Sequence, residues 1–127
     1  MRVVIDLPIP PSTNRLWRSV RTGRGVRLYK DRKYTAWLAE VGWEWQRQKP
    51  KGFKTIEGPV RSVLIVCPKR KTRDLGNYEK AVHDAAQHFG VIKDDNNIRH
   101  FQCWFGDASE APAGIRLIIE TINPDRA

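Results

Sequence analysis

Five carboxylates lie close together in the second half of a chain that has few acidic residues. The chain has 14 Asp and Glu against 23 Lys and Arg, and the five stand among basic neighbours. Like charges held close together repel one another unless a cation neutralises them. Carboxylate oxygens are hard ligands for Mg²⁺ or Mn²⁺, and nearby Lys and Arg suit phosphate, so the pattern predicts a divalent cation site for a phosphate-containing substrate. The five are Asp74, Glu79, Asp84, Asp94 and Asp95.

A structural interpretation of the same residues stays open beside this one. Asp74 would then cap a helix, Glu79 and Asp84 would be solvated helix residues, and 94–97 would form an ordinary turn. The segment also contains His83 and His88, which we predict to be surface or partner-helix residues.

Two helices are expected to position these groups. The first spans residues 31–48, with Asp31 as its N-cap, and the second spans 74–89, with Gly90 as its stop. In both, apolar residues recur at steps of three and four, which predicts one buried face. The first face contains Tyr34, Trp37, Leu38, Val41 and Trp45. The second contains Leu75, Tyr78, Val82, Ala85 and Phe89.

Four strands are expected around these helices, and they define the fold class. They span 2–7, 59–68, 98–105 and 115–122. Residues 15–30 are rich in Arg with a glycine-rich centre, which predicts a flexible basic arm or an irregular hairpin. The element order predicts a small α+β domain over residues 1–127, with a mixed four-stranded sheet and two main helices.

The net charge of +9 and the pI near 10.0 indicate a polyanionic partner, of which nucleic acid is the leading class. A basic surface that only confers solubility is the alternative. DNA contacts would come from the basic loop before the second helix and from the N-terminal arm, where Trp17 and Tyr29 either stack on bases or pack in a core or interface. The basic residues are Lys69, Arg70, Lys71 and Arg73, with Arg15, Arg18, Arg21, Arg24 and Arg27.

The two cysteines and the absence of long apolar stretches bear on the cellular compartment. Cys67 and Cys103 have no CxxC spacing and no His pair nearby, so we predict buried, reduced thiols and neither a disulfide nor a zinc site. No run approaches the roughly 18 apolar residues of a membrane-spanning helix, and the N-terminus lacks a signal sequence. We expect a cytoplasmic protein that does not enter a membrane.

Three segments together resemble a known family. PIPPSTNRLWR, RDLGNYEKAVHDAAQHFGVIKDD and the two terminal strands are similar to the RusA Holliday junction resolvases, in which a Pro-Pro-Ser-x-Asn start, an Arg-Asp-x-Asp-Asn-x-x-Lys motif and an Asp-Asp pair recur. The resemblance covers essentially the whole chain. It implies a homodimeric endonuclease, often encoded by prophages, that uses Mg²⁺ or Mn²⁺ to cut four-way DNA junctions in recombination and repair.

The resemblance also implies roles for individual residues. Asp74 matches the first catalytic aspartate, Lys80 the essential lysine and Asp95 the last metal-binding aspartate, with Asp94 beside it. Arg73 matches the basic residue before the motif. The motif asparagines Asn77 and Asn14 join Lys69, Arg70, Lys71, Arg73, Arg15 and Arg18 as expected DNA contacts.

One position departs from the family pattern. Gly76 stands where the second catalytic aspartate is expected, and glycine cannot bind a metal ion. Glu79 follows one helical turn later and would bring a carboxylate back toward the vacated space. The expected reaction is metal-assisted hydrolysis of a phosphodiester, with Lys80 offsetting developing charge. The alternatives are a catalytically impaired branched-DNA-binding protein of the same fold and a basic protein-interaction domain.

Overall fold

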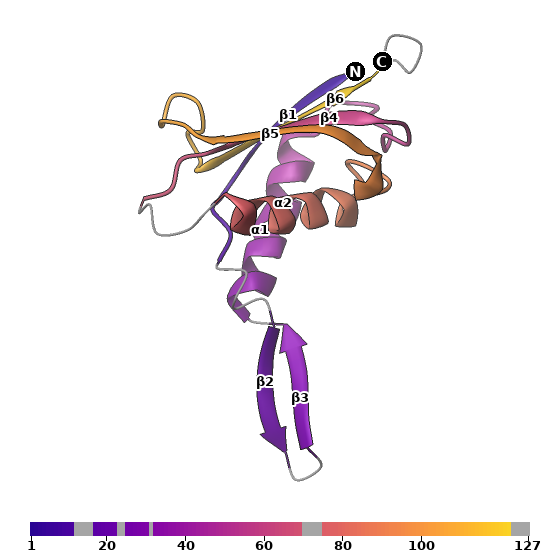
Figure 1. Cartoon of the computed structure of the whole chain (residues 1–127). Helices are drawn as coiled ribbons and strands as arrows, with labels where there is room; N and C mark the ends of the chain where they lie inside the picture. Colours follow the sequence, from indigo (N-terminus) through magenta and orange to yellow (C-terminus); the bar gives the residue numbers. More distant parts are fainter. Residues whose placement is uncertain (12–16, 23–24, 31, 70–74, 123–127) are drawn as a thin grey trace.

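A mixed sheet forms one layer of the molecule, and two helices cover one of its faces (Figure 1). The computed structural model describes residues 1–11, 17–22, 25–30, 32–69 and 75–122, with only the backbone at 17–22, 25–30 and 77. The elements are β1 (Arg2–Leu7), β2 (Trp17–Thr22), β3 (Gly25–Lys30), α1 (Arg32–Gln48), β4 (Val60–Val66), α2 (Gly76–His88), the 3₁₀ helix η2 (Asp95–Asn97), β5 (Ile98–Phe105) and β6 (Ile115–Thr121).

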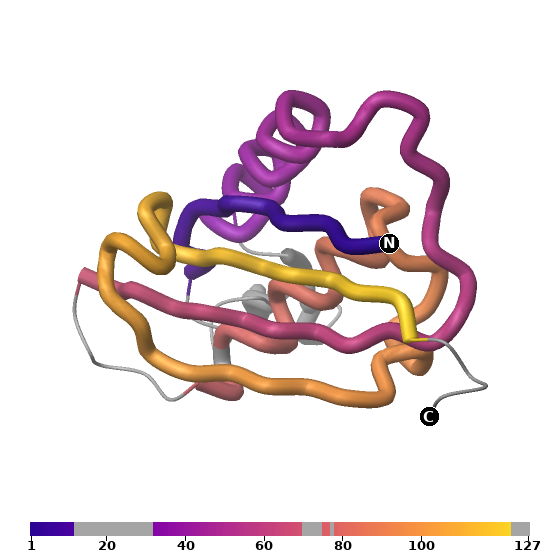
Figure 2. Tube along the Cα trace, turned by 90° about the horizontal axis from the view of Figure 1, so that it is seen from above, coloured from indigo at the N-terminus to yellow at the C-terminus, as the bar shows by residue number. Residues whose placement is uncertain are grey.

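The main sheet has the strand order β1-β6-β4-β5. Strand β6 pairs antiparallel with both β1 and β4, whereas β4 and β5 run parallel. Parallel neighbours need a crossover connection, and the segment that contains α2 provides it. The predicted mixed four-stranded sheet with two helices is therefore confirmed, and β5 forms one edge of it (Figure 2).

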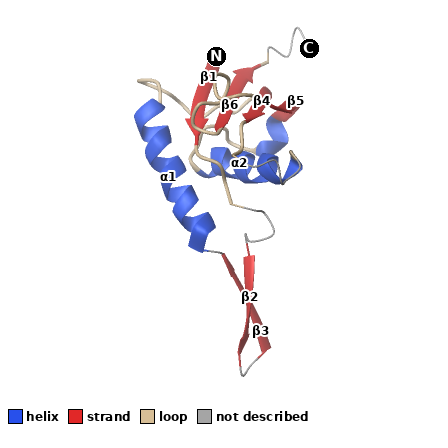
Figure 3. Ribbon diagram, turned by 90° about the vertical axis from the view of Figure 1, so that its left-hand side faces the viewer, coloured by secondary structure: helices blue, strands red, loops and turns tan. Residues whose placement is uncertain are grey.

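Strands β2 and β3 form a separate two-stranded sheet. They pair antiparallel without a register shift, from Trp17 opposite Lys30 to Thr22 opposite Gly25. Of the two predicted forms, an arm or an irregular hairpin, the structure shows a hairpin, and its pairing over the described residues is regular rather than irregular because continuous pairing satisfies the backbone groups that face the partner strand. The hairpin projects beyond the N-terminal end of α1, away from the main sheet (Figures 1 and 3).

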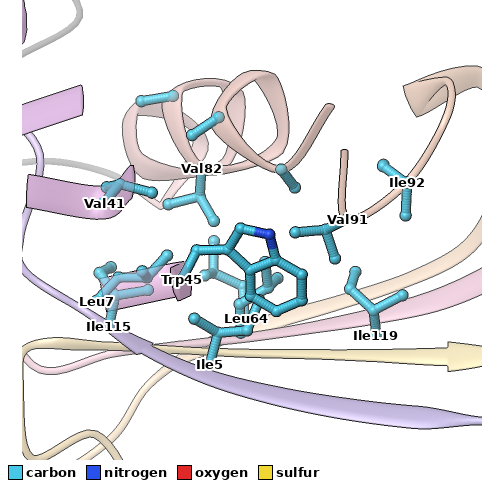
Figure 4. Close-up of a cluster of buried hydrophobic side chains, with 14 of the residues drawn as sticks. Ile5, Leu7, Val41, Trp45, Leu64, Val82, Val91, Ile92, Ile115 and Ile119 are labelled. Carbon is cyan, nitrogen blue, oxygen red and sulfur yellow. The ribbon is translucent and has the colours of Figure 1, made fainter. Parts of the chain in front are cut away.

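The core lies between the sheet and both helices. Of the predicted α1 face, Leu38 is only partly buried and the other four residues are buried. Trp45 is 2% exposed and packs among side chains from β1, β4, α2 and β6 (Figure 4). The indole of Trp37 donates to the Pro8 carbonyl oxygen at 2.8 Å, so its polar atom has a partner in this packed region. No helix in the described part of the chain is long and apolar enough to cross a membrane.

Three expectations need correction or fall outside the described residues. His83 was predicted to be a surface or partner-helix residue but is 3% exposed against the sheet, because α2 turns it toward β4 and the Phe101 ring of β5 lies edge-on against it. Cys67 and Cys103 are free thiols, as expected, but they are half-buried rather than buried. Asp31, the expected N-cap of α1, lies outside the described residues.

Gly90 follows the C-cap of α2 as the predicted stop, and its backbone has a conformation that residues other than glycine disfavour. Its φ is +76°, and a Cβ placed there would lie 3.2 Å from the Thr55 hydroxyl oxygen. We expect Gly90→Ala to lower the free energy of unfolding by about 1–2 kcal/mol, the cost of left-handed backbone for an L-residue. Urea denaturation measures the change. Gly58→Ala is the matched control, since its Cβ would meet open space and its φ is not positive. Equal effects of the two substitutions would contradict the assignment.

Candidate functional site

The structure describes part of the predicted site. The side chains of Glu79 and Lys80 belong to α2, Asp95 begins η2, and Asp94 precedes it. Lys69 is exposed. The remaining predicted residues lie outside the described residues or, for the last two, have only their backbone described: Asp74, Arg70, Lys71, Arg73, Asn14, Arg15, Asn77 and Arg18.

The pKa of Asp84 responds to two of the other predicted carboxylates. Burial raises the pKa of Asp84, and the negative charges of Asp95 and Glu79 raise it further, while Lys80 and His83 oppose the shift. Asp84 also contributes, after burial, to the raised pKa of Tyr34 at the start of α1. Asp84 of α2 therefore lies within electrostatic range of Glu79 and Lys80 on the same helix and of Asp95 at the start of η2. Asp84 belonged to the predicted cluster, but the resemblance assigned it no role; its spacing of four from Lys80 was the available signal.

Asp94 and Asp95 have different surroundings although they are adjacent. One carboxylate oxygen of Asp94 accepts a hydrogen bond from the backbone N–H of Asn96 at 2.9 Å, and this bond caps η2. The backbone N–H of Asp95 donates to Gln87 Oε1 at 3.0 Å, so α2 fixes the position of this residue. The turn interpretation therefore describes part of what Asp94 does. Gln87 was not predicted, and its place one turn after Asp84 on α2 was the only signal.

Glu79 is held by a buried histidine. His83 Nδ1 lies 2.8 Å from Glu79 Oε1, one turn along the same helix. The other ring nitrogen, Nε2, lies 2.7 Å from the hydroxyl of Ser62 on β4. The side chain of Glu79 is 38% exposed, so the chain of contacts runs from the core to the surface. Sequence reasoning missed Ser62 and the role of His83; the spacing of four between Glu79 and His83 was the detectable signal.

The donor set is suited in kind to a hard divalent cation. Its members are carboxylates, which Mg²⁺ and Mn²⁺ prefer over the sulfur ligands that zinc accepts. Within the described residues, no three His, Cys, Asp or Glu side chains are arranged to hold an ion by themselves. A complete site would need a further ligand from outside those residues, and Asp74 is the predicted one.

Cys103 on β5 is unsuited to nucleophilic chemistry at neutral pH. Burial, with a smaller contribution from the charge of Glu79, raises the pKa of its thiol to about 11. The thiolate is the reactive form of cysteine. The chemistry of this region therefore belongs to its carboxylates and lysine.

The raised pKa of Asp84 predicts how stability depends on pH. When the pKa of a carboxyl group is higher in the folded than in the unfolded state, the folded protein loses stability as pH rises from the lower of these two pKa values to the higher one. We expect Asp84→Asn to be slightly more stable than the wild type near neutral pH and equally stable in acid, below both pKa values. Thermal unfolding across pH measures the difference. A less stable variant at neutral pH would mean that attraction to Lys80 outweighs burial.

Comparison with known proteins places this arrangement in a wider context. Residues 8–120 match the family model of endodeoxyribonuclease RusA. The chain is also 34% identical over 92 residues to the crossover junction endodeoxyribonuclease RusA of Aquifex aeolicus (strain VF5), an overlap of 72% of this chain and 68% of that protein. The residues matched by the family model include all of α2, η2 and β5.

Proposed function

Because the chain belongs to the RusA family of endodeoxyribonucleases, we propose that it cuts four-way DNA junctions with the help of Mg²⁺ or Mn²⁺. The observation that carries the proposal is the family match across the segment in which the charges of Asp95 and Glu79 raise the pKa of Asp84 and that of Lys80 lowers it. Carboxylates and a lysine in this arrangement suit the hydrolysis of a phosphodiester.

Each described residue has a proposed task at this site. When bound, a divalent cation would supply Lewis-acid activation of the phosphodiester and of water. Asp95 would hold that cation together with Asp74, and its backbone bond to Gln87 fixes its position. Lys80, which is exposed on α2, would place its ammonium against the negative charge that develops on the phosphate.

The basic hairpin would hold the DNA. Residues 17–30 contain five Arg or Lys and no acidic residue, and the hairpin projects from the body of the molecule (Figure 3). Contacts from such residues go to the phosphate backbone, which gives affinity and positioning without reading the sequence. Lys69 and the basic residues that follow it would contact the same DNA near α2.

Cleavage of a labelled four-way junction tests the activity. With Mg²⁺ or Mn²⁺, the wild type is expected to release nicked duplexes. Asp95→Asn should lower the rate about 100-fold or more, because a charged ligand worth several kcal/mol is lost, while junction binding persists. Glu40→Gln, which removes an exposed carboxylate from α1, is the control and should cut normally. Full cutting by Asp95→Asn would contradict the site.

A second candidate function is junction binding with impaired cleavage. It is favoured by Gly76, and by the bond that directs Glu79 toward His83 in the C-terminal direction of α2. The same assay separates the two functions. If the wild type binds the junction without cutting it and the Gly76→Asp variant cuts, the second candidate is supported. If the wild type itself cuts, the first is supported.

The proposed resolvase acts as a homodimer, and β5 is the surface we assign to the second copy. On one side β5 pairs with β4, and no other described strand pairs along its outer edge. Phe101, Trp104 and Phe105 are 40%, 38% and 36% exposed on this strand. An open edge with exposed aromatic residues is prone to pair with another strand, and a second β5 would extend the sheet.

The mass in solution tests the dimer. Size-exclusion chromatography with light scattering should give twice the 14.7 kDa of the chain. Trp104→Glu and Phe105→Glu, made separately, should each shift the population toward monomer, because a charge would be buried without a partner. Trp43→Glu is the matched control, since Trp43 is 78% exposed on α1. A monomeric wild type, or a Trp43→Glu variant that alone dissociates, would contradict the assignment.

A further inference from the structure

Ser62 and His83 stand out because they are polar and fully enclosed. Among the described residues, tyrosine and tryptophan apart, they are the only buried polar side chains, with 0% and 3% exposure. Burying a polar group costs free energy unless it finds a hydrogen-bond partner. Here the partner of each is the other, at 2.7 Å between the hydroxyl and Nε2. The pair is therefore satisfied, and it links the sheet to α2.

The direction of the outer hydrogen bond is fixed. A glutamate carboxylate accepts hydrogen bonds and has none to donate, so His83 Nδ1 carries the proton and donates to Glu79 Oε1. The second hydrogen bond joins Nε2 to the Ser62 hydroxyl, which can donate or accept. Both nitrogens are used, and the ring has one orientation. The edge-to-face contact with Phe101, at 5.1 Å between ring centroids, holds the ring from the β5 side.

The order serine, histidine, glutamate is also that of a hydrolytic triad, but the burial excludes that role. Ser62 lies on β4 between β6 and β5 and is 0% exposed, so no substrate reaches its hydroxyl. The accessible member is Glu79. Any effect on chemistry must therefore pass outward, from Ser62 through His83 to the carboxylate.

We propose that Ser62 and His83 are positioning residues that hold the Glu79 carboxylate ready for the divalent cation. The inference rests on the proposed function. A flexible glutamate loses rotamer freedom when it binds an ion, and a preformed hydrogen bond from His83 meets part of that cost beforehand. Glu79 Oε2 has no hydrogen bond from any described residue, so one oxygen remains for the ion.

Mn²⁺ affinity of the full chain, measured by electron paramagnetic resonance of the free ion, tests the proposal. Glu79→Gln should weaken binding about 10-fold or more. Ser62→Ala with His83→Leu removes both polar partners at once, which is the change least harmful to folding, and should weaken binding about 10-fold or more as well. The triple variant should bind no more weakly than either, since one effect acts through the other.

Two single variants at His83 keep the test informative if the double variant unfolds. An asparagine amide occupies the place of Nδ1, so His83→Asn retains the donor to Glu79 and should keep affinity close to that of the wild type. A glutamine amide occupies the place of Nε2, so His83→Gln keeps the link to Ser62, loses the one to Glu79, and should weaken Mn²⁺ binding as Glu79→Gln does. A purely structural role would predict no such difference between the two amides.

The outcomes that overturn the proposal differ from those that overturn the function. If Ser62→Ala with His83→Leu, or His83→Gln, binds Mn²⁺ as tightly as the wild type, the positioning role is wrong while the nuclease assignment stands. The same holds if Glu79→Gln leaves the affinity unchanged. If the wild type neither binds Mn²⁺ nor cuts a junction, the proposed function fails, and the positioning role fails with it.

Discussion

The apolar stripe of α2 fixes the direction of every other side chain on that helix. Tyr78, Val82 and Ala85 are at most 1% exposed and pack in the core shared with the sheet and α1. Burying a side chain such as that of Val82 contributes about 1.5–3 kcal/mol, so rotating the helix about its axis would be costly. With 3.6 residues per turn, the stripe leaves Lys80 exposed and Asp84 half-buried, and it places His83 beside β4. The geometry of the candidate site is thus a consequence of core packing.

Strand β5 has two tasks at the boundary between core and surface. Phe101 and Phe105 lie edge-on against His83 and Tyr78, which closes the side of α2. The same residues stay 40% and 36% exposed at the margin of the sheet. A change there would affect both the packing of α2 and any partner on the open edge, so association and site geometry are coupled through one strand.

Local pattern was enough to predict the two main helices and the four strands of the main sheet, but not the contacts that depend on distant residues. The three- and four-residue spacing located α2 within two residues of its start, and Gly90 marked its end. The burial of His83 was missed because it depends on Ser62, 21 positions earlier on another strand, and on a ring from β5. The resemblance predicted a metal-binding role for Asp95, and the only local signal for Gln87, which holds the Asp95 backbone, was its place one turn after Asp84.

The pairing of β1 with β6 affects how the chain folds during its synthesis. Arg2 pairs with Glu120, and the Met1 amino group donates to the Thr121 hydroxyl at 2.7 Å across 120 positions. Strand β6 is also the neighbour of β4, so neither β1 nor β4 has its shared partner until β6 has been synthesised. On the ribosome β1 must wait for its partner, and β4 can pair only with β5 until β6 appears, which slows folding and favours aggregation. The sheet is therefore completed only by its last strand, and a nascent chain that stalls before residue 115 would lack one of the two inner strands of its own sheet.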